Sequence, residues 1–156
     1  MRQQIITILL LSAVVFLLIS CKEETARIGE EAPTLAAFDL AGNPVNLPNH
    51  QAITLLTFWS ESCGVCLAEL QQFSKLQQQY PEKLQILAIN IDGEKANTAQ
   101  AVQKYQLTIP VGKDQLNISA ERYQVIGTPT SFIIQQGKIL AKYEGLIPIQ
   151  EITQLL

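Results

Sequence analysis

The chain has 156 residues, of which 47% are hydrophobic and 16% are charged, a balance that is typical of a globular protein and excludes a disordered chain. Its 14 acidic residues exceed its 11 basic residues, which argues against nucleic acid as a partner. At this length the chain has room for one domain with a sizeable core.

The first residues have the features of an export signal. Arg2 is followed by an almost unbroken apolar run from Ile5 to Ile19, which is shorter than the roughly 20 residues that span a bilayer. The sequence Leu18-Ile19-Ser20-Cys21 resembles the bacterial lipobox, in which the chain is cut before a cysteine that receives lipid. We therefore expect residues 1–20 to be a lipoprotein signal peptide and Cys21 to carry the anchor. An ordinary cleaved signal or an uncleaved anchor is the alternative.

The next segment is charged and has no periodic apolar face. We expect residues 21–32 to form a tether that holds a domain of residues 33–156 near the membrane. The protein is thus expected in the bacterial cell envelope. Lys22 stands where an Asp favours retention in the inner membrane, so in a Gram-negative envelope the outer membrane is expected.

The first half of the domain predicts a hairpin, a strand and a helix. Residues 38–47 alternate around a Gly-Asn turn and predict a small hairpin. Residues 52–59 form a near-continuous apolar run and predict a buried central strand. A helix is expected from about residue 63 to residue 80, because Pro81 disfavours its continuation.

The second half adds further strands and helices. A buried strand is expected over residues 84–91, and a helix over residues 94–105, where apolar side chains recur at helical spacing. The last expected elements are a helical turn, the two strands of a hairpin and a terminal helix, over residues 118–123, 130–135, 138–144 and 149–156. This order predicts an α/β fold with a central mixed sheet flanked by helices.

Two of the three cysteines, Cys63 and Cys66, are separated by only two residues. A closed zinc site needs about four ligands, and beyond Cys21 only His50 is available. A purely structural disulfide at this spacing would close almost no loop. A reactive pair fits the position, because residue 63 lies at the start of the predicted helix, where free N–H groups and the helix dipole favour a thiolate. The second cysteine, one turn on, would resolve a mixed disulfide.

Three features together resemble the thioredoxin-like superfamily. They are Phe58-Trp59 before Cys63-Gly64-Val65-Cys66, Gly127-Thr128-Pro129-Thr130 before a strand, and the extra strand-helix unit between them. Within the superfamily, residues 32–156 are most similar to the membrane-tethered thiol:disulfide oxidoreductases of the TlpA/ResA type. The resemblance implies a thioredoxin-like fold with an N-terminal β-hairpin and an inserted strand-helix unit. It also implies a monomer without a cofactor or metal, which exchanges disulfides with a protein substrate and an upstream thiol donor.

The same resemblance assigns substrate-binding residues. It implies that Pro129 is a cis-proline that faces the cysteines. It implies that the backbone of Thr128 pairs with an extended segment of the substrate, and it places Trp59 on the substrate-binding side. Apocytochrome c is a candidate substrate through family membership alone.

Glu69 is the expected proton acceptor for Cys66. A glutamate occurs here in ResA-type proteins, whereas the strand position at which thioredoxins often carry an acid is Thr57. At about 100° per residue, Glu69 also falls inside the apolar arc of the helix, near Leu70 and Phe73. A carboxyl there would be desolvated and its pKa raised, which suits proton relay near neutral pH. The alternative is that the side chain bends out to solvent.

The motif departs from many relatives at two positions. Val65 replaces a proline, and Ser62 replaces an aromatic residue. The residues between and beside the cysteines tune the reduction potential, so the direction of electron flow stays open, with reduction of a partner's disulfide favoured. Glu61, beside the motif, is expected to be a solvated charge.

Two other functions remain as alternatives. A thiol peroxidase of the peroxiredoxin type would need Pro and Thr at the positions of Leu56 and Ser60. A copper-binding delivery protein with a thioredoxin-like fold would need wider cysteine spacing and a well-placed histidine, for which His50 is the only candidate.

Overall fold

The structure, a computed structural model, describes residues 24–48 and 51–156. The expected signal peptide, Cys21 and His50 lie outside the described residues. Over the ranges that are described, none of the helices combines the length and the apolar character of a membrane span.

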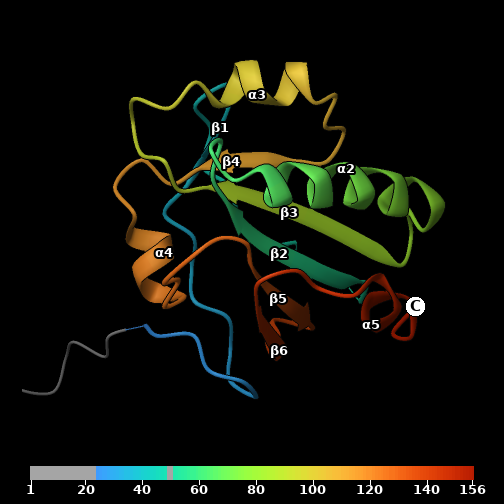
Figure 1. The fold of residues 1–156 in the computed structure, drawn as a ribbon. Helices are drawn as coiled ribbons and strands as arrows, with labels where there is room; N and C mark the ends of the chain where they lie inside the picture. The colour runs from blue at the N-terminus through green and yellow to red at the C-terminus, as the bar shows by residue number, and fades with distance from the viewer. Residues whose placement is uncertain (1–23, 49–50) are drawn as a thin grey trace, which may run out of the picture.

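The described residues form a six-stranded mixed sheet with the order β1-β4-β3-β2-β5-β6 (Figure 1). The strands are β1 (Phe38–Asp39), β2 (Ile53–Trp59), β3 (Leu84–Asn90), β4 (Val111–Lys113), β5 (Thr130–Gln135) and β6 (Lys138–Glu144). The helices are α2 (Gly64–Gln79), α3 (Thr98–Lys104), α4 (Ile118–Arg122) and α5 (Ile149–Thr153). Strands β2, β3 and β4 pair in parallel, and the other pairs are antiparallel. The predicted thioredoxin-like α/β fold is confirmed.

The middle of the sheet is covered on both faces. All seven residues of β2 are buried, as a continuous apolar run predicts for a strand between two layers. Helices α2, α3 and α5 pack on one face, around Leu55 and Phe73. Helix α4 and the N-terminal segment pack on the other face (Figure 1). The rings of Phe58, Tyr123 and Phe132 meet there at centroid distances of 5.0 to 6.1 Å.

Four elements differ from the sequence prediction. Of the hairpin expected over residues 38–47, only β1 is a strand; it pairs with β4, and a single bridge joins Phe38 to Pro44. The terminal helix α5 ends at Thr153, three residues earlier than expected.

Strand β4 was not predicted, because it has only three residues and directly follows Pro110. Helix α3 begins at Thr98, four residues later than expected. The side chain of Asn97 accepts a hydrogen bond from the N–H of Gln100 and so caps the helix there. The carbonyl groups before it bind the ammonium group of Lys113 instead of continuing the helix.

The segment from residue 24 to residue 32, expected to be part of a tether, is bound along the domain. The N–H of Gly29 donates to the carbonyl of Ile139 at 2.8 Å, and the N–H of Ala32 donates to the carbonyl of Gly137 at 2.8 Å. The segment therefore pairs with the outer edge of β6, whose backbone groups would otherwise be open to another chain. The folded unit includes these residues.

A buried hydroxyl at the end of α4 binds the backbone directly after this N-terminal segment. Tyr123 is fully buried, and its hydroxyl donates to the carbonyl of Pro33 at 2.7 Å. We expect Tyr123→Phe to lower the free energy of unfolding in urea by about 1–3 kcal/mol, because it leaves a buried carbonyl without a donor. Tyr143→Phe is the matched control, since its hydroxyl binds the exposed Glu151 and its removal should cost less than about 0.5 kcal/mol. Equal losses in the two variants would contradict this assignment.

Candidate active site

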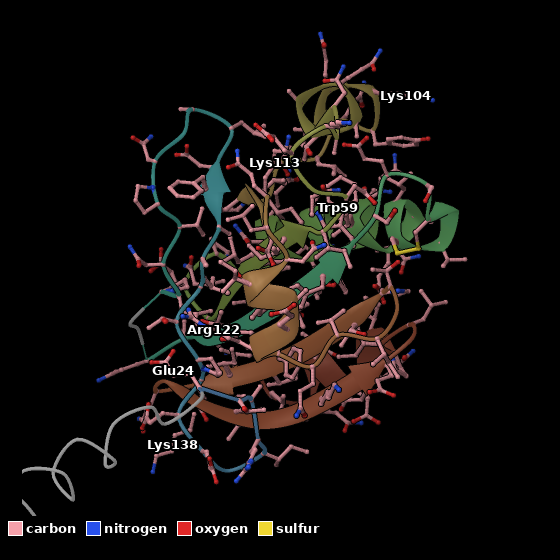
Figure 2. All side chains as sticks on the ribbon, turned by 90° about the vertical axis from the view of Figure 1, so that its left-hand side faces the viewer. Glu24, Trp59, Lys104, Lys113, Arg122 and Lys138 are labelled. Atoms are coloured by element: carbon pink, nitrogen blue, oxygen red, sulfur yellow. A yellow bond between two sulfur atoms is a disulfide. The ribbon has the colours of Figure 1, made fainter. Side chains whose placement is uncertain are left out.

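The two cysteines of the motif are joined by a disulfide, with their Cα atoms 5.2 Å apart. The disulfide lies where β2 ends and α2 begins, seen as the yellow bond at the start of the green helix in Figure 2. It is far from Glu24, the first described residue, which lies at the opposite end of that view. The prediction that Cys63 and Cys66 form a pair at the start of a helix is confirmed.

The two sulfur atoms have different surroundings. Cys63 is the N-cap residue of α2, and its Sγ accepts a hydrogen bond from the N–H of Cys66 at 3.2 Å. Cys63 is half-buried, whereas Cys66 is completely buried. A negative charge on the first sulfur would therefore be stabilised by an N–H donor and by the helix dipole, and only this sulfur is open to a partner.

The peptide bond between Thr128 and Pro129 is cis, as the resemblance implied. The carbonyl oxygen of Thr128 lies 3.7 Å from Sγ of Cys63. The disulfide sulfur carries no proton, so here the two atoms are only in contact. When Cys63 is reduced to a thiol, its S–H can donate a hydrogen bond to this carbonyl. The carbonyl of Pro129 accepts from the N–H of Gly145 at 2.8 Å, which holds the loop against the end of β6. The cis-proline loop thus faces the reactive sulfur.

The prediction that Glu69 lies on the buried face of the helix is confirmed. Its exposed fraction is 4%, and its Oε1 accepts a hydrogen bond from the N–H of Ile147 at 2.8 Å. Burial raises its pKa to about 7, even though this hydrogen bond acts in the opposite direction. Glu69 follows Cys66 by three residues on the same helix, so the two side chains are neighbours. Both are buried, whereas Val65, between the two cysteines, is exposed.

A groove of about 430 Å³ reaches Val65, the residue that directly precedes Cys66. One wall comes from α2 and the other from the segment that precedes α5, and its lining includes Val65, Glu69, Leu146, Ile147 and Pro148. The carboxyl of Glu69 is therefore reached from this groove.

Trp59 occupies a different place from the one expected for a substrate-binding residue. Its exposed fraction is 0%, and its indole N–H has no partner among the described residues. It is the last residue of β2, and its side chain belongs to the core beneath α2. In this disulfide form Trp59 supports the site from below and does not line its surface.

Two contributors to the site were not predicted. Ile147 provides the N–H that binds Glu69, and Asp92 accepts a hydrogen bond at 2.6 Å from the N–H of Glu61 in the loop before Cys63. These pairs are separated by 78 and 31 residues, so no local pattern predicts either contact.

The geometry also bears on the alternative functions. Within residues 24–48 and 51–156, no group of three or more His, Cys, Asp or Glu side chains is placed to hold a metal ion. Leu56, at the position where a peroxidase would need proline, is fully buried in the core on the opposite face of the sheet from Cys66. It therefore contributes nothing to a peroxide pocket.

Comparisons with known proteins agree with this site. The AhpC/TSA family matches residues 28–143. The chain is 33% identical to the thiol-disulfide oxidoreductase ResA of Bacillus thuringiensis subsp. konkukian, over 90% of this chain and 85% of that protein. It is 30% identical to the thioredoxin-like protein YneN of Bacillus subtilis, over 88% of this chain and 83% of that protein.

Solved structures share the fold. One, described as a thiol:disulfide interchange protein of the DsbE type from Chlorobium tepidum, has a TM-score of 0.74 and 26% identity, and the match covers 84% of this chain and 96% of that one. StoA from Bacillus subtilis has a TM-score of 0.67 and 22% identity, with coverage of 80% and 96%, and it supports the fold alone. The chain therefore belongs to the AhpC/TSA family of thioredoxin-like proteins, and within it to the thiol:disulfide oxidoreductases of the ResA type.

Proposed function

We propose that this oxidoreductase reduces disulfides of partner proteins in the bacterial cell envelope. The observation that carries the proposal is the unequal burial of its two sulfur atoms. Cys63 is accessible at the N-cap of α2, and Cys66 is buried behind it. The accessible sulfur makes the attack on a partner, and the buried sulfur then breaks the link.

The proposed reaction has two exchange steps. The Cys63 thiolate attacks one sulfur of the partner's disulfide, and the other sulfur leaves as a thiolate. Glu69 takes the proton of the Cys66 thiol, and the resulting thiolate attacks Sγ of Cys63. The partner leaves with both sulfurs reduced, and the protein is left with the disulfide seen in the structure. An upstream thiol donor returns the two electrons.

The partner is proposed to bind as an extended segment at the cis-proline loop. Thr128 supports this role because its carbonyl lies beside Cys63 and belongs to a backbone that continues into β5. The residues proposed for the site all come from one chain, which supports a monomer as the active form.

The membrane is proposed to be reached through lipid on Cys21. The lipobox-like sequence supports the anchor, and Lys22, in place of an Asp after the cysteine, supports the outer membrane if the envelope is Gram-negative. Only two residues separate Cys21 from Glu24, where the described structure begins, so an anchor at this cysteine would hold the domain close to the bilayer.

The reduction potential of the cysteine pair tests the direction of electron flow. We expect equilibration with dithiothreitol to give a value near that of thioredoxin, about −270 mV, and far from that of DsbA, about −120 mV. Trp59 reports the equilibrium by fluorescence, because it is buried beneath the site and a nearby disulfide quenches indole emission. A value near the oxidising end would contradict the proposed role as a reductant.

A further inference from the structure

A tight turn joins the end of β2 to the start of α2. The N–H of Cys63 donates to the carbonyl of Ser60 at 3.1 Å and closes this turn, with Glu61 and Ser62 at its two central positions. Cys63 is at the same time the N-cap residue of α2. The conformation of the turn therefore decides the direction in which the chain enters the helix at the reactive cysteine.

Asp92, just beyond the end of β3, binds this turn. Its Oδ2 accepts a hydrogen bond at 2.6 Å from the N–H of Glu61. The closing bond of the turn uses the N–H of Cys63, so the N–H of Glu61 needs an acceptor from elsewhere, and Asp92 supplies it. Oε1 of Glu61 is itself shielded from solvent and has no hydrogen-bond partner among the described residues, which differs from the solvated charge expected from the sequence.

Asn90 fixes the position of Asp92. It is the last residue of β3, it is fully buried, and it lies opposite Trp59 in the parallel pairing with β2. Its Nδ2 donates to Oδ2 of Asp92 at 2.8 Å, and its Oδ1 accepts from the N–H of Asp92 at 3.1 Å. Both ends of this buried amide thus bind the same residue, which holds the carboxylate in place beside the turn.

The turn in its observed form keeps the nucleophile at the helix start. Sγ of Cys63 accepts from the N–H of Cys66 at 3.2 Å and lies 3.7 Å from the carbonyl oxygen of Thr128. The cap depends on the extended backbone of Cys63, with φ −88° and ψ 93°. If the turn changed shape, the cap would open, and a thiolate at Cys63 would lose the N–H donor and the helix dipole that stabilise it.

We propose that Asp92, held by Asn90, is a positioning residue for the nucleophile. By binding the N–H of Glu61 it keeps Cys63 at the N-cap of α2, and so keeps the thiolate stabilised and reactive. The inference rests on the proposed function, in which Cys63 makes the attack, and adds a residue that acts on it through the backbone.

Asp92→Asn and Asp92→Ala separate the hydrogen bond from the charge. The N–H of Glu61 and Nδ2 of Asn90 both donate to Oδ2, so the single amide oxygen of asparagine can accept both bonds. Alanine accepts neither, and both variants lack the negative charge, so a difference between them reports the hydrogen bonds alone. The side chain of Asp92 is exposed, so its truncation leaves no cavity in the core and the fold is retained.

Alkylation by iodoacetamide measures the thiolate directly. All variants carry Cys66→Ser, which keeps the N–H donor of that residue, and modification of Cys63 is read by mass spectrometry across a range of pH. We expect the Asp92→Ala variant to react about tenfold more slowly near pH 6.5 than the Asp92→Asn variant, because the pKa of Cys63 rises toward that of a free cysteine. Near pH 10, where the thiol ionises without help, the two rates should approach each other.

Asp39→Ala is the matched control. Asp39 also accepts backbone N–H groups in a turn, those of Ala41 and Asn43 at 2.9 and 2.8 Å, but it lies on the edge strand β1, with β4 and β3 between it and β2. Its removal should lower the urea midpoint about as much as Asp92→Ala does and leave the pH profile of Cys63 unchanged. A merely structural role for Asp92 predicts an unchanged profile in both variants.

Two outcomes would overturn the inference. Equal pH profiles for Asp92→Ala and Asp92→Asn would show that the hydrogen bonds do not affect the nucleophile, and an equal shift in Asp39→Ala would assign the effect to a general loss of stability. The protein with Asp92 intact tests the proposed function separately. If its Cys63 titrates like a free cysteine, the proposed function fails; if the pKa is lowered and stays so in both variants, only the positioning role fails.

Discussion

Replacing Cys63 with serine is expected to reduce disulfide exchange to the uncatalysed rate, while Cys66→Ser keeps the first step and traps the partner. The reason is the unequal burial of the two sulfurs: the N-cap sulfur is the one that a partner reaches, and the buried one acts only from inside. In the Cys66→Ser variant a mixed disulfide should accumulate, visible as a covalent adduct by mass spectrometry. The adduct should be released by dithiothreitol.

The two thiols of the reduced protein should differ in their reactivity. Alkylation of the reduced protein at neutral pH should modify Cys63 well before Cys66, because the first thiolate is stabilised by the helix start and is accessible. If Cys63→Ser formed the adduct in the same yield as Cys66→Ser, the assignment of nucleophile and resolving cysteine would be refuted. Equal alkylation of both thiols in the reduced protein would refute it as well.

Glu69→Gln is expected to slow the resolution of the mixed disulfide by about 10²-fold near pH 7. The wild-type rate should rise with pH through about 7, as the carboxyl ionises and becomes able to accept the Cys66 proton. The variant lacks this rise, and the difference should shrink toward pH 9, where the thiol ionises without help. The amide oxygen of glutamine still accepts from the N–H of Ile147, so the local structure is retained. Stopped-flow Trp59 fluorescence measures the step.

The pH dependence of stability tests the raised pKa of Glu69 independently of the kinetics. The pKa of Glu69 is raised from 4.5 to about 7 in the folded protein, so between these values the folded state holds the proton more tightly than the unfolded state. The free energy of unfolding should therefore fall as pH rises through this range, and Glu69→Gln should lack this contribution. The exposed control Glu82→Gln should behave as wild type in both measurements. Identical kinetics of wild type and Glu69→Gln from pH 5 to 9 would remove Glu69 from the mechanism.

The elements nearest the site were predictable because their signals are local. The apolar run of β2 marks a strand buried on both faces, and the helix after it ends where Pro81 requires. Strand β4 is too short to show a period, and its three residues are held by pairing with β3 and β1. The start of α3 depends on a contact with Lys113 from another strand.

The residues of the site likewise include some that the local sequence predicts and some that it does not. The cap position of Cys63 and the buried position of Glu69 both follow from helical geometry along one segment. The partners of these groups come from distant loops, so Ile147 and Asp92 were not predicted. The family resemblance placed Trp59 on the substrate-binding side, but which face of a strand a side chain occupies is decided by the layers packed around it.

The N-terminal segment along β6 has a consequence for the order in which the chain folds. It is synthesised early, yet the groups that bind it lie far along the sequence; Pro33 and Tyr123 are 90 residues apart. Contacts between such distant residues form late, because a long loop has to close before they contribute. We therefore expect the N-terminal segment to dock only after β6 has joined the sheet, because its backbone partners belong to that strand.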